Sequence, residues 1–92
     1  MKTTTIQISN YGTAIIVPTA KKIAETVDSS LRVPDTSVTM DFSGVRVIQT
    51  KAAEEIINPI KEKLGHSYNQ RVKITNTSRQ VTSVLAYISS LK

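Results

Sequence analysis

Few side chains of this chain have the chemistry that catalysis or metal binding requires. The 92 residues contain one histidine, His66, and no cysteine. A lone imidazole without a thiolate or a second histidine is a poor metal site. His66 follows Gly65 in a polar stretch that is typical of a surface loop. We therefore expect no bound metal and no thiolate nucleophile.

Paired carboxylates can also perform acid–base chemistry, and Glu54 and Glu55 are adjacent. Both lie in a stretch of helical periodicity, where consecutive side chains point about 100° apart, so they cannot flank one substrate. Glu54 is instead a candidate for a partner-binding helix face. The three glycines are isolated, so the chain has no Gly-rich phosphate-binding loop. The sequence predicts a protein that is not an enzyme and binds no cofactor.

Polar residues suited to binding come at the end of the β-branched, alternating residues 37–42. Asp41 lies at the end of this stretch, and Ser43 and Gly44 follow it. Aspartate commonly accepts backbone N–H groups in the turn that comes after it. Asp41 is therefore either a carboxylate that contacts a partner or the residue that orders the turn at Ser43 and Gly44, and the sequence leaves both interpretations open.

Three basic residues, Arg46, Lys51 and Arg79, each follow a predicted strand and are expected near one edge of the sheet. Such a cluster favours an acidic protein, a phosphate or nucleic acid. The net charge is +5, but no basic run exceeds two residues, a pattern typical of a mixed, solvated surface. No aromatic residues interleave with the cations, as single-stranded nucleic acid would require, and no helix concentrates base-reading side chains.

The spacing of apolar residues predicts the elements that carry these side chains. A period of two at residues 4–8, 37–42 and 71–75 predicts strands, and residues 14–17 fit either a second strand or an extended entry to a helix. A period of 3.6 predicts helices near residues 19–31, 50–64 and 78–91. Their expected buried residues are Ala20, Ile23, Ala24, Val27 and Leu31; Ala52, Ala53, Ile56, Ile57, Ile60 and Leu64; and Val81, Val84, Leu85, Ile88 and Leu91.

Local signals refine the ends of the predicted helices. Pro59 is expected to bend the second helix, with Asn58 capping a restarted turn, and Gly65 is a natural stop. Residues 77–80 have the spacing of a capping box, with Gln80 three residues after Thr77.

Strands that alternate with helices require crossover connections and an at least partly parallel sheet. The sequence therefore predicts an α/β fold of order β(β)αβαβα, with a mixed sheet of about four strands and three helices. Ligands of such sheets usually lie beyond the carboxyl ends of the strands, here residues 41–44 and 75–78.

The length and composition of the chain limit its class. The 92 residues suit one domain over residues 1–92, and no apolar run approaches the roughly 20 residues that cross a bilayer. The start of the chain lacks the apolar core of a signal peptide, and the absence of cysteine favours a reducing compartment. We expect a cytoplasmic protein that does not contact the membrane.

Residues 38–45, followed by Ile48 and by Thr50 at the start of a helix, resemble the STAS domains of anti-anti-sigma factors and sulfate-transporter tails. They are still more similar to the STAS-like family of unknown function DUF4325, in which a strand ends in Asp-Phe-x-x-Val and a helix begins with Ser/Thr-x-Ala-x-Glu. The matching residues here are Asp41, Phe42, Val45, Thr50, Ala52 and Glu54. The resemblance covers roughly residues 14–91.

The resemblance implies a regulatory module that binds another protein, with a histidine-kinase-like ATPase or similar signalling protein as partner. In anti-anti-sigma factors a serine at the start of this helix accepts a phosphoryl group, and Thr50 falls on that position. A phosphoryl group there would be stabilised by the helix N-terminus and would add roughly −1.5 to −2 charge to the surface. The implied partner-binding candidates are Asp41, Ser43, Gly44, Arg46, Gln49, Lys51 and Glu54.

Two alternatives remain beside this expectation. Around Thr50 the chain reads Gln49-Thr50-Lys51-Ala52, where the anti-anti-sigma pattern is Asp-Ser-Ser-Gly, so Thr50 is also interpreted simply as a helix-capping hydroxyl. The basic character of the chain also fits a nucleic-acid-associated or phage or plasmid accessory protein. The oligomeric state is not predicted by the sequence.

Overall fold

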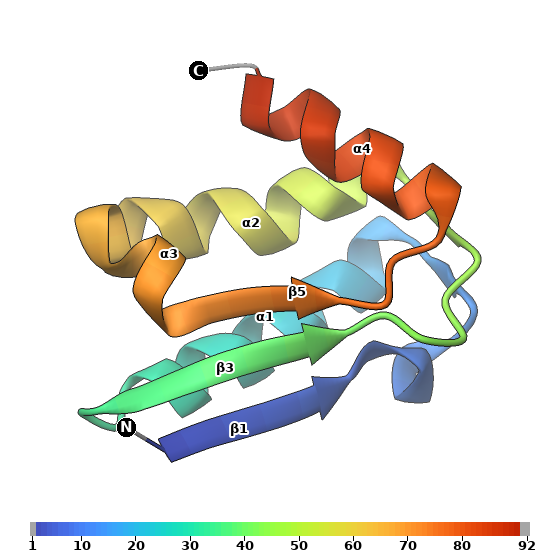
Figure 1. The fold of residues 1–92 in the computed structure, drawn as a ribbon. Helices are drawn as coiled ribbons and strands as arrows, with labels where there is room; N and C mark the ends of the chain where they lie inside the picture. The colour runs from blue at the N-terminus through green and yellow to red at the C-terminus, as the bar shows by residue number, and fades with distance from the viewer. Residues whose placement is uncertain (1, 91–92) are drawn as a thin grey trace.

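The computed structural model describes residues 2–90 and has an α/β architecture, as the sequence predicts (Figure 1). Strands and long helices alternate along the chain, because each stretch of period two is followed by one of period 3.6. In chain order the elements are β1 (Lys2–Gln7), the 3₁₀ helix η1 (Ile8–Tyr11), β2 (Ala14–Ile15), α1 (Val17–Leu31), β3 (Thr36–Asp41), β4 (Val47–Ile48), α2 (Thr50–Leu64), the 3₁₀ helix η2 (Gly65–Ser67), α3 (Tyr68–Arg71), β5 (Val72–Thr75) and α4 (Arg79–Ser90).

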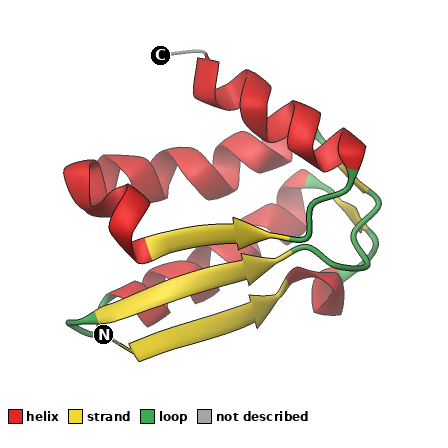
Figure 2. Ribbon diagram, in the orientation of Figure 1, coloured by secondary structure: helices red, strands yellow, loops and turns green. Residues whose placement is uncertain are grey.

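The main sheet contains three parallel strands in the order β1-β3-β5. Along β3, Val38 and Met40 are buried while Thr39 between them is half-buried, so the two faces of the sheet differ. The helices lie against the Val38 and Met40 face, and no helix crosses the face toward the viewer in Figure 2. The domain therefore has two layers, with a polar sheet face left open.

The remaining two strands form a separate sheet, which is a correction to the prediction of one mixed sheet of about four strands. Ala14 and Ile15 of β2 pair in parallel with Val47 and Ile48 of β4. Both sheets are parallel throughout, because every strand is followed by a helix or loop that returns the chain to the same starting edge. Residues 14–17 thus resolve into a two-residue strand and the entry to α1 at Val17.

The predicted helical stripes are largely confirmed. All but one of the predicted α1 residues and all but one of those in α2 are buried; Ala24 and Leu64 are half-buried. In α4, Val81 and Ile88 are buried, Val84 and Leu85 are half-buried, and Leu91 lies outside the described residues.

Two expectations about the ends and interior of α2 have different outcomes. The helix continues from Thr50 to Leu64 through Pro59, so Asn58 does not cap a restarted turn. Asn58 and Pro59 are both exposed, so the turn in which the proline supplies no N–H to the carbonyl four residues earlier lies on the solvent-facing side of α2. Gly65 ends the helix as predicted, with a φ of 53° that glycine adopts readily.

A single arginine ties the amino-terminal edge of the main sheet to α1. Arg71, the last residue of the short helix α3, donates through Nε to the Thr36 carbonyl at 2.9 Å. Its Nη2 donates to the carbonyls of Leu31 at 2.8 Å and Val33 at 3.2 Å. The guanidinium therefore satisfies carbonyl groups at the end of α1 and in the following turn, which an α-helix leaves unpaired.

Candidate functional site

The carboxyl ends of β3 and β5 are joined through Asp41. Its Oδ1 accepts a hydrogen bond from the Ser43 N–H at 2.9 Å and another from Asn76 Nδ2 at 3.1 Å. These bonds, that of the Ser43 N–H first, lower the pKa of the Asp41 carboxyl below its ordinary value. Of the two sequence interpretations, the structure favours the turn-ordering role for Asp41.

Ser43 and Gly44 also have packing roles in this turn. The side-chain amide of Gln7 donates to the Ser43 carbonyl at 3.2 Å and to its hydroxyl at 3.3 Å. Gly44 has a φ of 88°, and a Cβ there would lie 3.1 Å from the Cβ of Ser9. Both residues are exposed, but their positions are explained by the contact between this turn and η1.

The small β2–β4 sheet presents two apolar side chains to solvent. Ile15 and Ile48 face each other in register and are buried, so the residues beside them point the opposite way. Val47 is 44% exposed and Ile16, which continues β2 in extended conformation, is 45% exposed. Together with the exposed Ala14, they form an outward surface that we call the β2–β4 patch.

The first turn of α4 holds β4 in place from the side opposite β2. Gln80 exchanges two hydrogen bonds with the backbone of Ile48, and Ser78 Oγ donates to the Arg46 carbonyl at 3.0 Å. Ser78 Oγ also accepts from the Val81 N–H at 3.2 Å, so Ser78 caps α4. The predicted capping box is therefore wrong in both members, because Thr77 is not the cap and Gln80 reaches β4 instead.

Thr50 is the first residue of α2 and is exposed beside this patch. Gln49 occupies the N-cap position, with extended backbone and no side-chain cap, and its carbonyl accepts from the Ala53 N–H at 2.9 Å. The interpretation of Thr50 as a capping hydroxyl is therefore wrong, and the Thr50 hydroxyl has no hydrogen-bond partner among residues 2–90. The Gln49 N–H donates to Ile15, which links the start of α2 to β2.

The predicted basic residues lie near the same edge and, within residues 2–90, form no ion pairs with carboxylates. Arg46, Lys51 and Arg79 are exposed, and the hydrogen bond from Ser78 to Arg46 brings the backbone before β4 against the start of α4. The ion pairs within the described chain instead join Asp28 to Arg32 and Lys63, near the ends of α1 and α2. No first turn of α1, α2 or α4 carries an acidic residue. Although the Asp41 carboxylate also lies at this edge, the three cations and the helix N-termini make it net electropositive.

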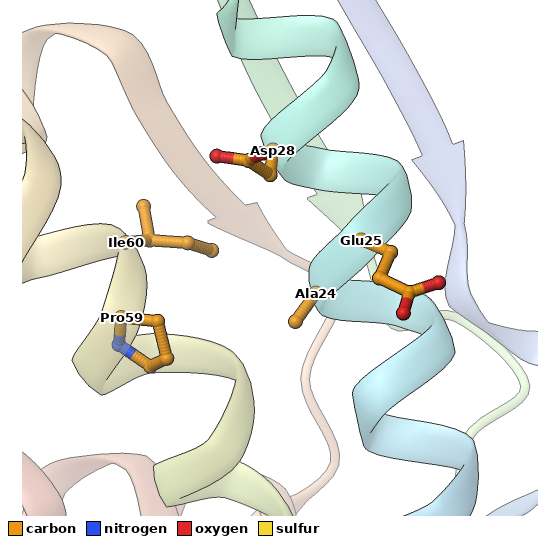
Figure 3. Close-up of a pocket in the computed structure, with 5 residues that line it drawn as sticks. All are labelled: Ala24, Glu25, Asp28, Pro59 and Ile60. Carbon is orange, nitrogen blue, oxygen red and sulfur yellow. The ribbon is translucent and has the colours of Figure 1, made fainter.

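Two shallow grooves lie on α2 and differ in chemistry. The groove between α1 and α2 has a volume of about 220 Å³ and is lined by Ala24, Glu25, Asp28, Pro59 and Ile60 (Figure 3). It contains none of the predicted site residues. The other, of about 270 Å³, includes Lys51 and the half-buried Glu54 among its mostly polar lining. Glu54 therefore lies along the helix, beyond the β2–β4 patch.

Sequence reasoning missed four residues of this edge: Ile16, Val47, Ser78 and Gln80. The two-residue strands β2 and β4 are too short for alternation to identify an outward face. The signal that could have indicated strand β4 was the β-branched pair Val47–Ile48, which follows the turn at Gly44.

Within residues 2–90, no group of three or more His, Asp or Glu side chains is placed to hold a metal ion. Helices in the same range are all too short or too polar to cross a bilayer. No family model, curated protein or solved structure matches the chain.

Proposed function

We propose that the protein is a non-enzymatic, STAS-like regulatory module of the cytoplasm that binds a protein partner through the carboxyl edge of its strands. The observation that carries the proposal is the β2–β4 patch, where Ile16 and Val47 are nearly half exposed and strand β4 is held by β2 on one side and by Gln80 of α4 on the other. Arg46, Gln49, Thr50 and Lys51 border this patch.

The patch has the composition of a small interaction surface. Burying the exposed halves of Ile16 and Val47 against a partner contributes about 1 kcal/mol each. The cations around it, Arg46 and Lys51, attract a partner with an acidic rim and increase the association rate. An apolar centre with a charged rim is the usual arrangement of protein interfaces.

Thr50 gives this surface a point of regulation, in keeping with the STAS resemblance. Its exposed hydroxyl lies at the N-terminus of α2, where a phosphoryl group would meet free backbone N–H groups. The added negative charge would weaken contact with an acidic partner rim. A histidine-kinase-like ATPase or another signalling protein is the partner class that the resemblance supports.

The test is to cross-link the protein to its partners and to identify the proteins that are recovered with it. The wild type is compared with two variants in which a valine is replaced by aspartate. Val47→Asp alters the β2–β4 patch, whereas Val33→Asp alters an apolar side chain that is 55% exposed in the turn before β3. The proposal predicts that a specific protein is lost with Val47→Asp and retained with Val33→Asp. Equal recovery by both variants, with circular dichroism showing both to be folded, contradicts it.

The electropositive edge favours a second candidate function, association with nucleic acid. Arg46, Lys51 and Arg79 are exposed there, and none of them forms an ion pair within the described part of the chain. Nucleic-acid affinity depends steeply on salt because counterions are released from the phosphates. Fluorescence anisotropy with a labelled 20-mer duplex at 50 and 200 mM salt tests this function, which predicts a steep loss of affinity at the higher concentration.

A further inference from the structure

The strand β1, one of the two edge strands of the main sheet, has a free hydrogen-bonding edge whose geometry is set by its pairing with β3. The Lys2 N–H donates to the Asp35 carbonyl, and Lys2 is in register with Thr36. In a parallel pair, alternate residues direct both peptide groups to the neighbouring strand. Lys2, Thr4 and Ile6 therefore face β3. The N–H and C=O groups of Thr3, Thr5 and Gln7 point away from it, toward the side where Figure 1 shows no further strand.

This edge has few of the features that usually protect an edge strand from pairing. β1 has six residues and is exposed from Lys2 to Thr5; it contains no proline, and its one charged residue, Lys2, is at the start of the strand. The outer edge of β4 is treated differently, because the side chains of Ser78 and Gln80 satisfy its backbone groups. The outer edge of β4 is therefore closed by side chains of the same chain, whereas the outer edge of β1 is not paired within the described residues.

We propose that two copies of this protein pair through β1 in antiparallel orientation, which joins their three-stranded sheets into one of six strands. A two-fold axis beside Thr4 places Thr3 of one copy opposite Thr5 of the other. Because Thr3 and Thr5 are outward-facing residues, each such pair exchanges two backbone hydrogen bonds. The edge is therefore complementary to a second copy of itself, as a closed two-fold dimer requires.

The side chains on both faces suit this pairing. On the open face, Thr3 and Thr5 of the two copies are cross-strand neighbours, and threonine pairs stabilise antiparallel strands. On the helix face, Thr4 of one copy lies opposite Thr4 of the other, and Lys2 of each copy lies opposite Ile6 of the other. The aliphatic part of Lys2 then covers Ile6, which is 8% exposed, while the two ammonium groups stay at opposite ends of the interface.

The contact is small, so we expect a weak dimer that is populated only at high protein concentration. Two six-residue strands bury far less than the roughly 1,200–2,000 Å² of stable complexes. The pairing lies at the opposite side of β3 from β5 and does not involve Ile16 or Val47, so it goes beyond the proposed function and does not depend on it.

The test is sedimentation velocity from micromolar to millimolar concentration, with matched variants at Thr5. The wild-type mass is expected to rise from 10.1 kDa toward twice that value. Thr5→Pro removes an outward N–H without breaking a bond to β3, so it is expected to stay monomeric, whereas Thr5→Val keeps the N–H and dimerises. Val47→Asp should dimerise as the wild type does.

Amide hydrogen exchange of the wild-type protein gives an independent readout that needs no variant. Thr3 and Thr5 N–H groups are expected to exchange at least tenfold more slowly at millimolar than at micromolar concentration, while Thr4, already bonded to β3, changes little. A wild-type protein that is monomeric throughout overturns the proposal. So does a dimer that Thr5→Pro leaves intact, or a dimer in which Thr3 and Thr5 exchange is unchanged.

Discussion

The side-chain amide of Gln80 pairs with the backbone of Ile48 as a neighbouring strand would. Gln80 Oε1 accepts from the Ile48 N–H at 2.9 Å, and Nε2 donates to the Ile48 carbonyl at 3.1 Å. Ile48 is 2% exposed, so its side chain is buried beside these bonds. The contact fixes β4, and with it Val47, against the first turn of α4, so the orientation of the β2–β4 patch depends on a residue outside it.

Gln80→Ala is expected to lower the free energy of unfolding by about 1–2 kcal/mol, because it leaves both backbone groups of Ile48 without a partner. The Ile48 amide should also exchange faster by about tenfold. Urea unfolding and amide exchange measure the two effects. Arg79→Ala, at the preceding exposed position, is the control and should change stability by less than about 0.5 kcal/mol. Equal effects of the two variants would show that the amide contact is not structural.

Arg71→Ala is expected to be the more damaging change, with a loss of about 2–3 kcal/mol. One guanidinium donates to the carbonyls of Leu31, Val33 and Thr36, and bonds from charged donors are stronger than neutral ones. Arg71→Lys should recover only part of this loss, since an ammonium group cannot reproduce the planar arrangement of donors. Denaturant unfolding of the wild type, Arg71→Lys and Arg71→Ala measures the three free energies of unfolding and tests this order of stability. Full recovery by lysine would mean that the charge alone stabilises this turn.

The fold was predictable wherever a period extended over several residues. The stripe Ala20, Ile23 and Val27 predicted α1, and the alternation of Val38 with Met40 predicted β3. The division into two sheets was not predictable, because a two-residue strand such as β2 has no period to detect. The helix α2 continues through the exposed Pro59 without the restarted turn that was expected at Asn58, and the bend at Pro59 stays a prediction.

The candidate site was predictable only as a region. The order of strands and helices placed Asp41 and Thr50 at the same edge of the structure. The partners of Asp41 were not predictable, because Asn76 comes from a strand end 35 positions away. The role of Gln80 was also hidden, since its spacing from Thr77 matched a local capping motif, whereas its partner lies 32 positions away. Local patterns cannot distinguish a local bond from a long-range one.

Acid should remove a part of the stability that comes from Asp28. Hydrogen bonding to Lys63, and the charges of Lys63 and Arg32, lower the pKa of the Asp28 carboxyl below its ordinary value of 3.8. A group whose pKa is lower in the folded state stabilises the fold above the unfolded pKa, and loses this effect as the pH falls through the folded pKa. The urea concentration at the unfolding midpoint, measured from pH 7 to pH 2, should therefore decrease once the pH is below about 4. The decrease should be smaller in Asp28→Asn. Parallel curves for the two proteins would contradict this assignment.

Substitutions at Thr50 should change partner binding while leaving the fold intact. Gln49 is the N-cap and the Thr50 hydroxyl has no hydrogen-bond partner among the described residues, so Thr50→Ala is expected to change stability by less than about 0.5 kcal/mol. Thr50→Glu places a negative charge in the first turn of α2, where the helix dipole favours it by about 0.3–1 kcal/mol. Both variants should therefore remain folded in thermal unfolding measurements.

The binding experiment compares Thr50→Glu with a control of equal charge change, using the partner recovered with the wild type. Lys61→Glu is a poor control because Lys61 Nζ lies 5.3 Å from the centre of the Tyr68 ring and because its charge changes by two units. Lys73→Gln, exposed on the open sheet face, changes the charge by one unit, as Thr50→Glu does. If the edge beside Thr50 is the partner surface, Thr50→Glu should weaken binding at least tenfold at both low and high salt, whereas Thr50→Ala and Lys73→Gln bind nearly as the wild type. Equal weakening by Thr50→Glu and Lys73→Gln, which disappears at high salt, would mean that the net charge of the protein and not this surface determines binding.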